Sequence, residues 1–352
     1  MEKPKVQTRE ILFGKTLTQL EQLVLELDMH RFTAAQIADW LYKKEISNIQ
    51  EMSNISRAHR QKLEERFDVG ISAPVKVQES VDGTKKYLYR SLLGKFIEAA
   101  YIPESKRNTL CVSSQVGCKM GCLFCMTGKQ GFQGQLSAGE IVNQIRSLPE
   151  FKSLTNIVYM GMGEPFDNLE NVMQSLDILT SDWGYGMSPK RITVSTIGII
   201  PAMKTFLENS RCHLAVSLHS PFEDERRKLM PIENVYALPD VLKAIRDFPL
   251  GKQRRISFEY IVFKDLNHSA RHVKELARIL DGIRCRINLL YFHHIPNTPL
   301  EAPSDEVIHQ FKEALEAKGL TTTIRKSRGQ DIYAACGMLS TKELLKKNAP
   351  DQ

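Results

Sequence analysis

The sequence predicts an α/β protein whose core is a partial (β/α) barrel of about six βα units, preceded by a small helical domain and a β meander. From Thr109 onward, short apolar runs alternate with longer segments of helical periodicity, which favours parallel strands joined by helices. Before that point the chain shows helical periodicity and then hairpin signals. We therefore expect a helical domain at 1–72, a meander at 73–103, a βα core at 104–331 and a C-terminal segment at 332–352.

The helical domain and the meander follow from local patterns. Apolar residues recur at helical spacing through the first 70 residues: Leu17, Leu20, Val24 and Leu27, then Ile37, Trp40 and Leu41, then Leu63 and Phe67. An Asp82-Gly83 dipeptide between alternating runs predicts a hairpin, and a second turn at Gly94 extends it to three strands.

The βα core has seven candidate strands, at 109–113, 156–160, 191–196, 212–218, 255–263, 285–291 and 320–325. Ser137 and Glu140 form a capping box that opens one connecting helix. Another helix begins at Ser304 and ends before Gly319. In a barrel of this kind, reactive groups gather at the C-terminal ends of the strands.

Composition describes an ordinary soluble protein, with 42% hydrophobic and 25% charged residues. The chain has no apolar run of membrane-spanning length and no secretory leader pattern, so we expect a cytoplasmic, membrane-free protein. Its seven cysteines argue against a disulfide framework, and Cys212 and Cys285 fit buried strands. The net charge of +7 permits a polyanionic partner.

Three cysteines follow the first core strand in the segment Cys118-Lys-Met-Gly-Cys122-Leu-Phe-Cys125. Iron-sulfur clusters are ordinarily held by four cysteines, so three ligands leave one iron open to a reactant. Zinc is the alternative, since Cys111 lies upstream as a possible fourth ligand. Glycines around the triplet allow the backbone to approach a bulky cluster.

A second motif, Met160-Gly-Met-Gly163-Glu164-Pro165, follows the next strand. Together the two motifs resemble those of the radical S-adenosylmethionine (SAM) superfamily. The resemblance implies a [4Fe-4S] cluster on Cys118, Cys122 and Cys125, with SAM on the open iron and its amino group received at Gly163-Glu164. It also implies that SAM yields a radical able to remove hydrogen from carbon.

From about Gly94 to Met338 the chain further resembles the RlmN branch of the RlmN/Cfr family of RNA adenine methyltransferases. The segments that carry this resemblance are Cys111-Val-Ser-Ser-Gln-Val-Gly-Cys118, Gly-Lys-Gln-Gly-Phe132, Ser195-Thr-Ile-Gly198 and Asp331-Ile-Tyr-Ala-Ala-Cys336. It implies that two SAM molecules are used per turnover. Cys336 takes a methyl group from the first, and the radical from the second activates that methyl for addition to adenine.

The resemblance also implies the remaining catalytic roles. Cys111 attacks the Cys336 sulfur to release the methylated base, which leaves a Cys111–Cys336 disulfide for an external electron donor to reduce. Glu98 matches the general base that takes the adenine proton; its alternative is an exposed strand residue. Further SAM contacts fall on Ser195, Ser217, Leu218, His219 and His293. His219 could instead be a core histidine, and His293 stands where the family usually has asparagine.

RNA is the implied partner of what we expect to be a monomer. The resemblance points to C2 of a peptidyl-transferase-loop adenosine in 23S rRNA and to the adenosine 3′ of the tRNA anticodon. Cfr-like methylation at C8, small-molecule radical chemistry and a non-enzymatic iron-sulfur RNA-binding module are the alternatives. Basic residues offer phosphate contacts: Lys119, Lys129, Lys190, Arg191, Arg226 to Lys228, Arg325 to Arg328, and Lys43, Lys44, His59 and Arg60 in the helical domain.

Overall fold

The computed structural model describes residues 9–249, 251 and 254–341, which form two compact units. One unit contains the chain up to Ala73 together with Ser137–Leu148 and Glu170–Ser188; the other contains Pro74–Leu136, Pro149–Leu169 and the chain from Pro189 onward. Of the C-terminal segment expected at 332–352, residues 342–352 lie outside the described residues.

The first unit is a helical domain, as the periodicity predicts. Its elements are β1 (Glu10–Ile11), α1 (Leu17–Glu26), α2 (Thr33–Ala38), the π-helical turn η1 (Asp39–Lys43), η2 (Ile49–Glu51), α3 (Arg57–Arg66) and β2 (Phe67–Asp68). Phe67 is not helical as expected, because it opens the short strand that pairs with β1. Two helices from later in the chain, α5 (Ala138–Arg146) and α6 (Leu169–Thr180), add Val142 and Ile178 to this core.

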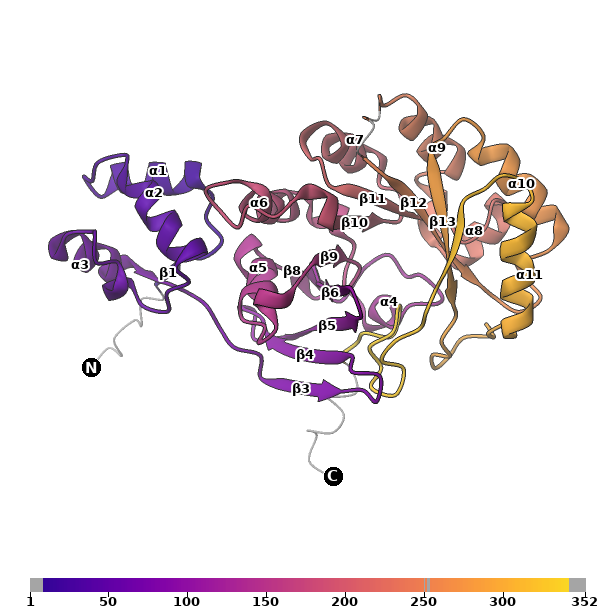
Figure 1. The fold of residues 1–352 in the computed structure, drawn as a ribbon, viewed down its shortest axis with the longest axis horizontal. Coiled ribbons are helices and arrows are strands. Elements are labelled where there is room, and N and C mark those ends of the chain that lie inside the picture. The colour runs from indigo at the N-terminus through magenta and orange to yellow at the C-terminus, as the bar shows by residue number, and fades with distance from the viewer. Residues whose placement is uncertain (1–8, 250, 252–253, 342–352) are drawn as a thin grey trace, which may run out of the picture. The chain divides into compact units, whose positions relative to one another are not determined.

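The second unit is built on one ten-stranded sheet in the order β14-β13-β12-β11-β10-β9-β6-β5-β4-β3 (Figure 1). The strands are β3 (Lys76–Glu79), β4 (Lys85–Arg90), β5 (Phe96–Glu104), β6 (Arg107–Cys111), β9 (Asn156–Tyr159), β10 (Ile192–Thr196), β11 (His213–Ser217), β12 (Ile256–Val262), β13 (Cys285–Tyr291) and β14 (Thr322–Arg325). The strands β3 to β6 are antiparallel, and β6 and β9 to β14 are parallel. The predicted meander therefore continues the core sheet.

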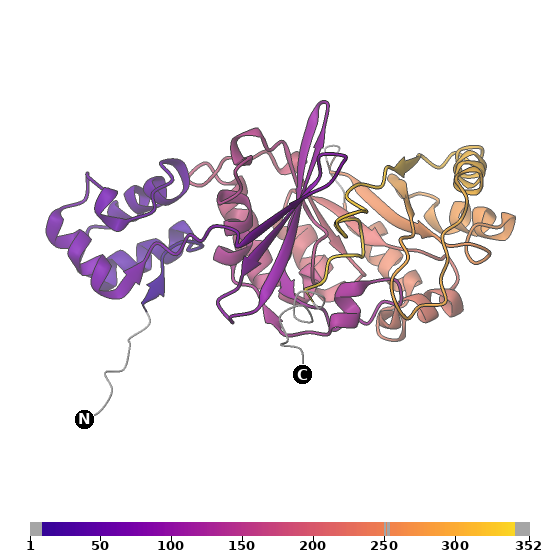
Figure 2. The ribbon, with the colours of Figure 1, turned by 90° about the horizontal axis from the view of Figure 1, so that it is seen from below.

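Within the second unit, helices connect the parallel strands and lie along the outer side of the sheet in Figures 1 and 2. They are α7 (Ile200–Asn209), α8 (Glu223–Leu229), α9 (Leu238–Arg246), α10 (Ala270–Leu280) and α11 (Asp305–Glu316). Both β14 and β3 are free edges of the sheet, so the barrel is partial, as the sequence predicts. The helix starts are also confirmed: Ser137 forms its capping box and Ser304 caps α11.

Shorter elements complete the second unit: β7 (Gln115–Val116), α4 (Met126–Gln130), β8 (Gly134–Gln135) and the turns η3 (Phe151–Ser153), η4 (Pro165–Asn168), η5 (Pro189–Arg191) and η6 (Pro231–Asn234). Cys212 is buried as expected, whereas Cys285 is only half-buried. None of the helices in the described ranges combines the length and the apolar character that crossing a bilayer requires.

Candidate active site

Most of the candidate residues of the core lie at one edge of the parallel sheet, where its strands end. Cys111 ends β6, Ser217 ends β11 and Arg325 ends β14. Glu164 follows β9 and His293 follows β13. Because the strands are parallel, their carboxyl ends meet at this edge, which is where barrel enzymes place their chemistry.

The cysteine triplet occupies the loop between β7 and α4. Cys118 and Cys122 are buried, and Cys125 is half-buried immediately before α4. The loop depends on Gly117, which has a φ of 72° and lies so close to Gly131 that a Cβ would meet the Gly131 carbonyl oxygen at 1.7 Å. This position therefore excludes any residue with a side chain.

The protein surroundings of Cys118 and Cys122 favour the neutral thiol. Burial, with smaller contributions from Cys125 and Glu164, raises the pKa of Cys118 to about 12. Burial likewise raises the pKa of Cys122 well above its usual value, with Cys125 and Cys118 adding to the effect. Thiols in this state become good ligands when a metal displaces their protons.

The donor set is compatible with an iron-sulfur cluster, because cysteine thiolates are its usual ligands. In the described part of the chain, no three His, Cys, Asp or Glu side chains converge closely enough to hold one metal ion. The ligands of a cubane bind different irons, so their sulfurs need not converge on one point. Cys118, Cys122 and Cys125 share one loop, and Cys125 is close enough to raise the pKa of both Cys118 and Cys122.

Glu164 is almost fully buried and is held by backbone groups of its own turn and of the segment that follows β10. Its Oε1 accepts a hydrogen bond from Phe166 N at 3.1 Å, and its Oε2 accepts one from Ile197 N at 3.0 Å. Burial raises its pKa to about 7, although these hydrogen bonds oppose the shift. Gly163 has a φ of 100°, and a Cβ there would lie 2.5 Å from the side chain of Gln115. The side chain of Glu164 thus fixes the turn, which presents the backbone of Gly163 and Glu164 at the strand edge.

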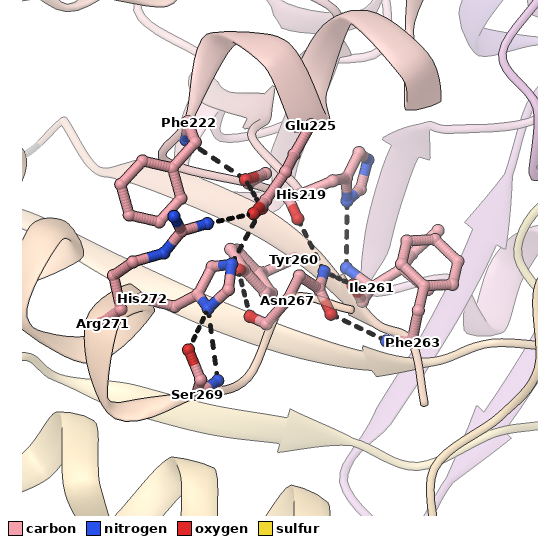
Figure 3. A network of polar contacts seen from close by, with 11 residues as sticks. His219, Phe222, Glu225, Tyr260, Ile261, Phe263, Asn267, Ser269, Arg271 and His272 are labelled. Carbon is pink, nitrogen blue, oxygen red and sulfur yellow. Dashed lines mark hydrogen bonds and ion pairs between the residues drawn. The ribbon is translucent and has the colours of Figure 1, made fainter. Parts of the chain in front are cut away.

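His219 lies in the turn after β11 with a φ of 58°, a conformation uncommon for a residue other than glycine. Two hydrogen bonds hold His219 in this conformation (Figure 3). Its Nδ1 accepts one from Ile261 N at 2.9 Å, and its carbonyl oxygen accepts one from Asn267 Nδ2 at 2.6 Å. Its ring packs edge-on against Phe124 of the cysteine loop. Burial lowers its pKa to about 3, so the imidazole is neutral. These contacts are those of a buried structural histidine, and its role toward SAM stays a prediction.

The other predicted SAM contacts lie on neighbouring strands. Ser195 pairs with Ala215, two residues before Ser217, so Ser195 and Ser217 lie on the same face of the sheet. Leu218 is fully buried. His293 Nε2 lies 2.5 Å from Ser327 Oγ, so this histidine contacts the segment after β14.

Cys111 and the segment that carries Cys336 are brought together from distant parts of the chain. Cys111 forms a small apolar cluster with Ala100, Val158 and Ala334, and Ile332 packs against it. Burial, with a smaller contribution from Cys336, raises the pKa of Cys111 to about 12. Both cysteines are free thiols; the residue Cys111 is buried and the residue Cys336 is exposed. Burial of the thiol raises the pKa of Cys336, and the positive charge of Arg325 opposes that rise.

Glu98 is buried on β5, which rules out the exposed strand residue considered as its alternative. Its Oε1 lies 3.1 Å from Lys86 Nζ, and its Oε2 accepts a hydrogen bond from Ser340 N at 3.1 Å. Ala100, two residues further along β5, pairs with Cys111, so Glu98 and Cys111 share a face of the sheet. Sequence reasoning missed Lys86, because adjacent lysines on an alternating strand do not reveal which one points inward.

A polar row across three strands was also missed. Glu259 on β12 pairs with Asn288 on β13, which pairs with Thr323 on β14. Glu259 Oε1 accepts a hydrogen bond from Asn288 Nδ2 at 2.7 Å, and its Oε2 lies 3.5 Å from Arg325 Nη1. Arg325, expected to contact phosphate, is therefore paired with Glu259 and close to both Cys111 and Cys336. The sequence signal that could have revealed this row is Glu259, a carboxylate in the middle of β12, whose residues are all buried.

The expectation that Arg226 contacts phosphate is wrong. Its side chain is fully buried and forms an ion pair with Glu233. The guanidinium also donates to Ile197 O at 2.9 Å and Ser217 O at 3.2 Å. Arg226 therefore ties two strand ends together, whereas Lys190 and Arg191 are exposed as expected.

Two family models match the chain. The model described as the radical SAM superfamily matches residues 112–280, and the model of the ribosomal RNA large subunit methyltransferase N-terminal domain matches residues 11–69. The first covers the cysteine loop and most of the parallel sheet, and the second covers the helical domain.

Curated relatives match along nearly the whole chain. One from Phocaeicola vulgatus, named probable dual-specificity RNA methyltransferase RlmN, is 53% identical over 97% of each chain. Another from Syntrophus aciditrophicus, named dual-specificity RNA methyltransferase RlmN, is 40% identical over 94% of this chain and 97% of its own. The crystal structure of a radical SAM methyltransferase from Sphaerobacter thermophilus, 38% identical, covers 94% of this chain and 99% of its own with a TM-score of 0.87.

Proposed function

Because the chain belongs to the RlmN family of radical SAM RNA methyltransferases, we propose that it methylates C2 of adenosine in 23S rRNA and in tRNA. The rRNA target is an adenosine of the peptidyl-transferase loop, and the tRNA target is the adenosine 3′ of the anticodon. The observation that carries the proposal is the packing of Cys111 against the segment of Cys336. A direct methyl transfer would need no such pair of thiols.

In this proposal Cys118, Cys122 and Cys125 hold a [4Fe-4S] cluster, and the turn at Gly163-Glu164 with Ser195, Ser217, Leu218, His219 and His293 forms the SAM site. When bound, the cluster and SAM supply a methyl group and a radical that removes hydrogen from carbon. Cys336 attacks the sulfonium methyl as a thiolate and becomes S-methylcysteine, which releases S-adenosylhomocysteine. Arg325 favours that thiolate, since its positive charge opposes the rise in the pKa of Cys336.

The later steps use the buried groups behind Cys336. Once its methylene carbon is bonded to adenine, the adduct radical must give up one electron, which the iron-sulfur cluster would take back. Glu98 takes the C2 proton, and Lys86 stabilises the carboxylate that must accept it. Cys111 then attacks the Cys336 sulfur, which forms a disulfide and breaks the bond from sulfur to the methylene carbon. That carbon keeps the bond electrons and takes up a proton to become the new methyl group. An external donor reduces that disulfide before the next turnover.

The test is digestion and mass spectrometry of RNA treated with the anaerobically reconstituted protein, SAM and a reductant. We expect 2-methyladenosine in both 23S rRNA and tRNA. A product of 8-methyladenosine would assign the Cfr-like reaction. RNA that binds without modification would instead favour the iron-sulfur RNA-binding module.

A further inference from the structure

We propose that the tip of the β3–β4 hairpin, residues Ser80–Thr84, is a positioning element that holds Cys336 near Cys111. The inference rests on the carrier role proposed above for Cys336. It concerns residues that none of the catalytic roles uses, and it explains how a thiol outside regular secondary structure keeps a defined place.

The segment from Arg328 to Thr341, called here the carrier segment, has no helix or strand in its described residues. It follows β14 and runs beside the end of the sheet formed by β3 and β4 (Figure 1). A segment of this kind has no hydrogen-bond ladder to fix its backbone. Its position must therefore come from contacts with the rest of the fold.

The contacts before Cys336 are made with the hairpin tip through two carboxylates. Asp331 of the carrier segment accepts hydrogen bonds from Ser80 Oγ at 2.5 Å and from Val81 N at 3.2 Å. Asp82 of the hairpin accepts a hydrogen bond from Gly329 N of the carrier segment at 3.0 Å. Hydrogen bonds to ionised acceptors are among the stronger ones in proteins. The hydrogen bonds lower the pKa of Asp82 to about 2 despite the opposing effect of burial, so its carboxylate is charged at neutral pH.

Close backbone packing supports the same contact. Gly329 has a φ of 63°, and a Cβ at this position would lie 2.8 Å from Thr84 Cγ2 and 2.8 Å from Ala334 Cβ. Ala334 in turn belongs to the apolar cluster of Cys111. The hairpin, the turn at Gly329 and the surroundings of Cys111 thus form one continuous set of contacts.

The contacts after Cys336 are made with the other side of the site. Met126 N donates to Gly337 O at 2.7 Å, and Thr127 Oγ1 donates to Leu339 O at 2.7 Å. Both donors lie on α4, directly after the cysteine loop. Cys336 therefore lies between an attachment to the hairpin tip and one to α4. Loss of the first leaves only the apolar packing of Ile332 and Ala334 to hold the chain before Cys336.

The hairpin tip is suited to positioning rather than to building the fold. It joins the edge strand β3 to β4, and Val81 at the turn is almost fully exposed. The removal of its polar contacts leaves the parallel sheet and the apolar core untouched. The expected effect is a wider range of positions for Cys336, which lowers its effective concentration beside Cys111.

The experiment measures that effective concentration through the Cys111–Cys336 disulfide. Cluster-loaded protein is equilibrated anaerobically with mixtures of reduced and oxidised glutathione, then alkylated and analysed by peptide mass spectrometry. In this exchange the two thiols are oxidised to a disulfide while one glutathione disulfide is reduced to two thiols. We expect the double variant D82A/D331A to lower the equilibrium constant about tenfold, as the loss of charge-assisted hydrogen bonds implies.

Matched variants separate positioning from stability. Asp247→Ala removes an exposed aspartate that forms an ion pair with Lys243 on the outer helix α9. Its disulfide equilibrium constant should match that of the wild type. Asp331→Asn keeps one carbonyl acceptor and should give an intermediate constant. Thermal melting shows whether the double variant folds. If it does not, Ser80→Ala, which removes a single hydroxyl, is used for the same measurement.

The outcomes distinguish this inference from the proposed function. A wild-type disulfide constant in both D82A/D331A and Ser80→Ala, with methylation by the wild-type protein intact, would overturn the positioning role alone. If the wild-type protein neither forms the disulfide nor methylates RNA, the carrier role itself fails and the inference fails with it.

Discussion

Replacing Lys86 with methionine would leave the Glu98 carboxylate buried without its counter-charge. The side chains of Lys86 and Glu98 are only 9% and 2% exposed, and their charged atoms lie 3.1 Å apart. At an effective dielectric constant of about 20, unit charges at 3.1 Å attract by about 5 kcal/mol. Part of that attraction offsets the cost of burying the ammonium, and we expect Lys86→Met to lower the free energy of unfolding by about 3–5 kcal/mol.

Urea denaturation of the cluster-free protein, followed by circular dichroism, measures this loss. The matched control is Lys312→Met, which breaks an ion pair of 2.7 Å with Glu316 on the exposed face of α11. Exposed helical pairs contribute about 0.3–0.5 kcal/mol. The double variant Lys86→Met/Glu98→Gln should recover part of the stability, since no buried charge is then unpaired. Equal losses in Lys86→Met and Lys312→Met would refute the reasoning.

Three further variants test the site. Gly117→Ala should lower the iron content after reconstitution, because its Cβ would meet the Gly131 carbonyl. The control is Gly94→Ala, which has a similar φ of 71° but no atom within 4 Å of its Cβ, and it should keep its iron. If both retain iron equally, the cysteine loop does not depend on that contact. Cys111→Ala should accumulate a covalent protein–RNA adduct on denaturing gels, and full turnover without an adduct would exclude its resolving role. Cys336→Ala should bind the cluster, with an unchanged absorption spectrum, yet give no methylated RNA; normal methylation would exclude a methyl carrier.

Much of the fold was predictable because its signals are local. The alternation of apolar runs and helical segments gave the parallel strands, and capping residues such as Ser137 and Ser304 gave the helix starts. The three cysteines and the Gly163-Glu164 turn then fall at strand ends, where parallel topology collects them. Glu98 is buried on β5, an interior strand of the sheet, and the sequence pattern alone did not settle this burial.

Side-chain contacts that only the folded chain defines were not predictable. Arg226 sits in a basic run that reads as a solvated surface, yet it is buried because Glu233 neutralises it. Lys86 is buried for the same reason beside Glu98. The link between Asp331 and Ser80 joins opposite ends of the chain, and neither residue has an unusual sequence context. Each case depends on a partner whose proximity only the folded chain defines.

The central claim is that the methyl group passes through Cys336, and isotope labelling tests it most directly. SAM with a trideuterated methyl group is supplied to the reconstituted protein with RNA, and the methyladenosine is analysed by mass spectrometry. Passage through Cys336 removes one deuterium as an atom and adds one proton on release, so we predict a product methyl with two deuteriums. A product methyl that keeps all three would show direct transfer and contradict the account.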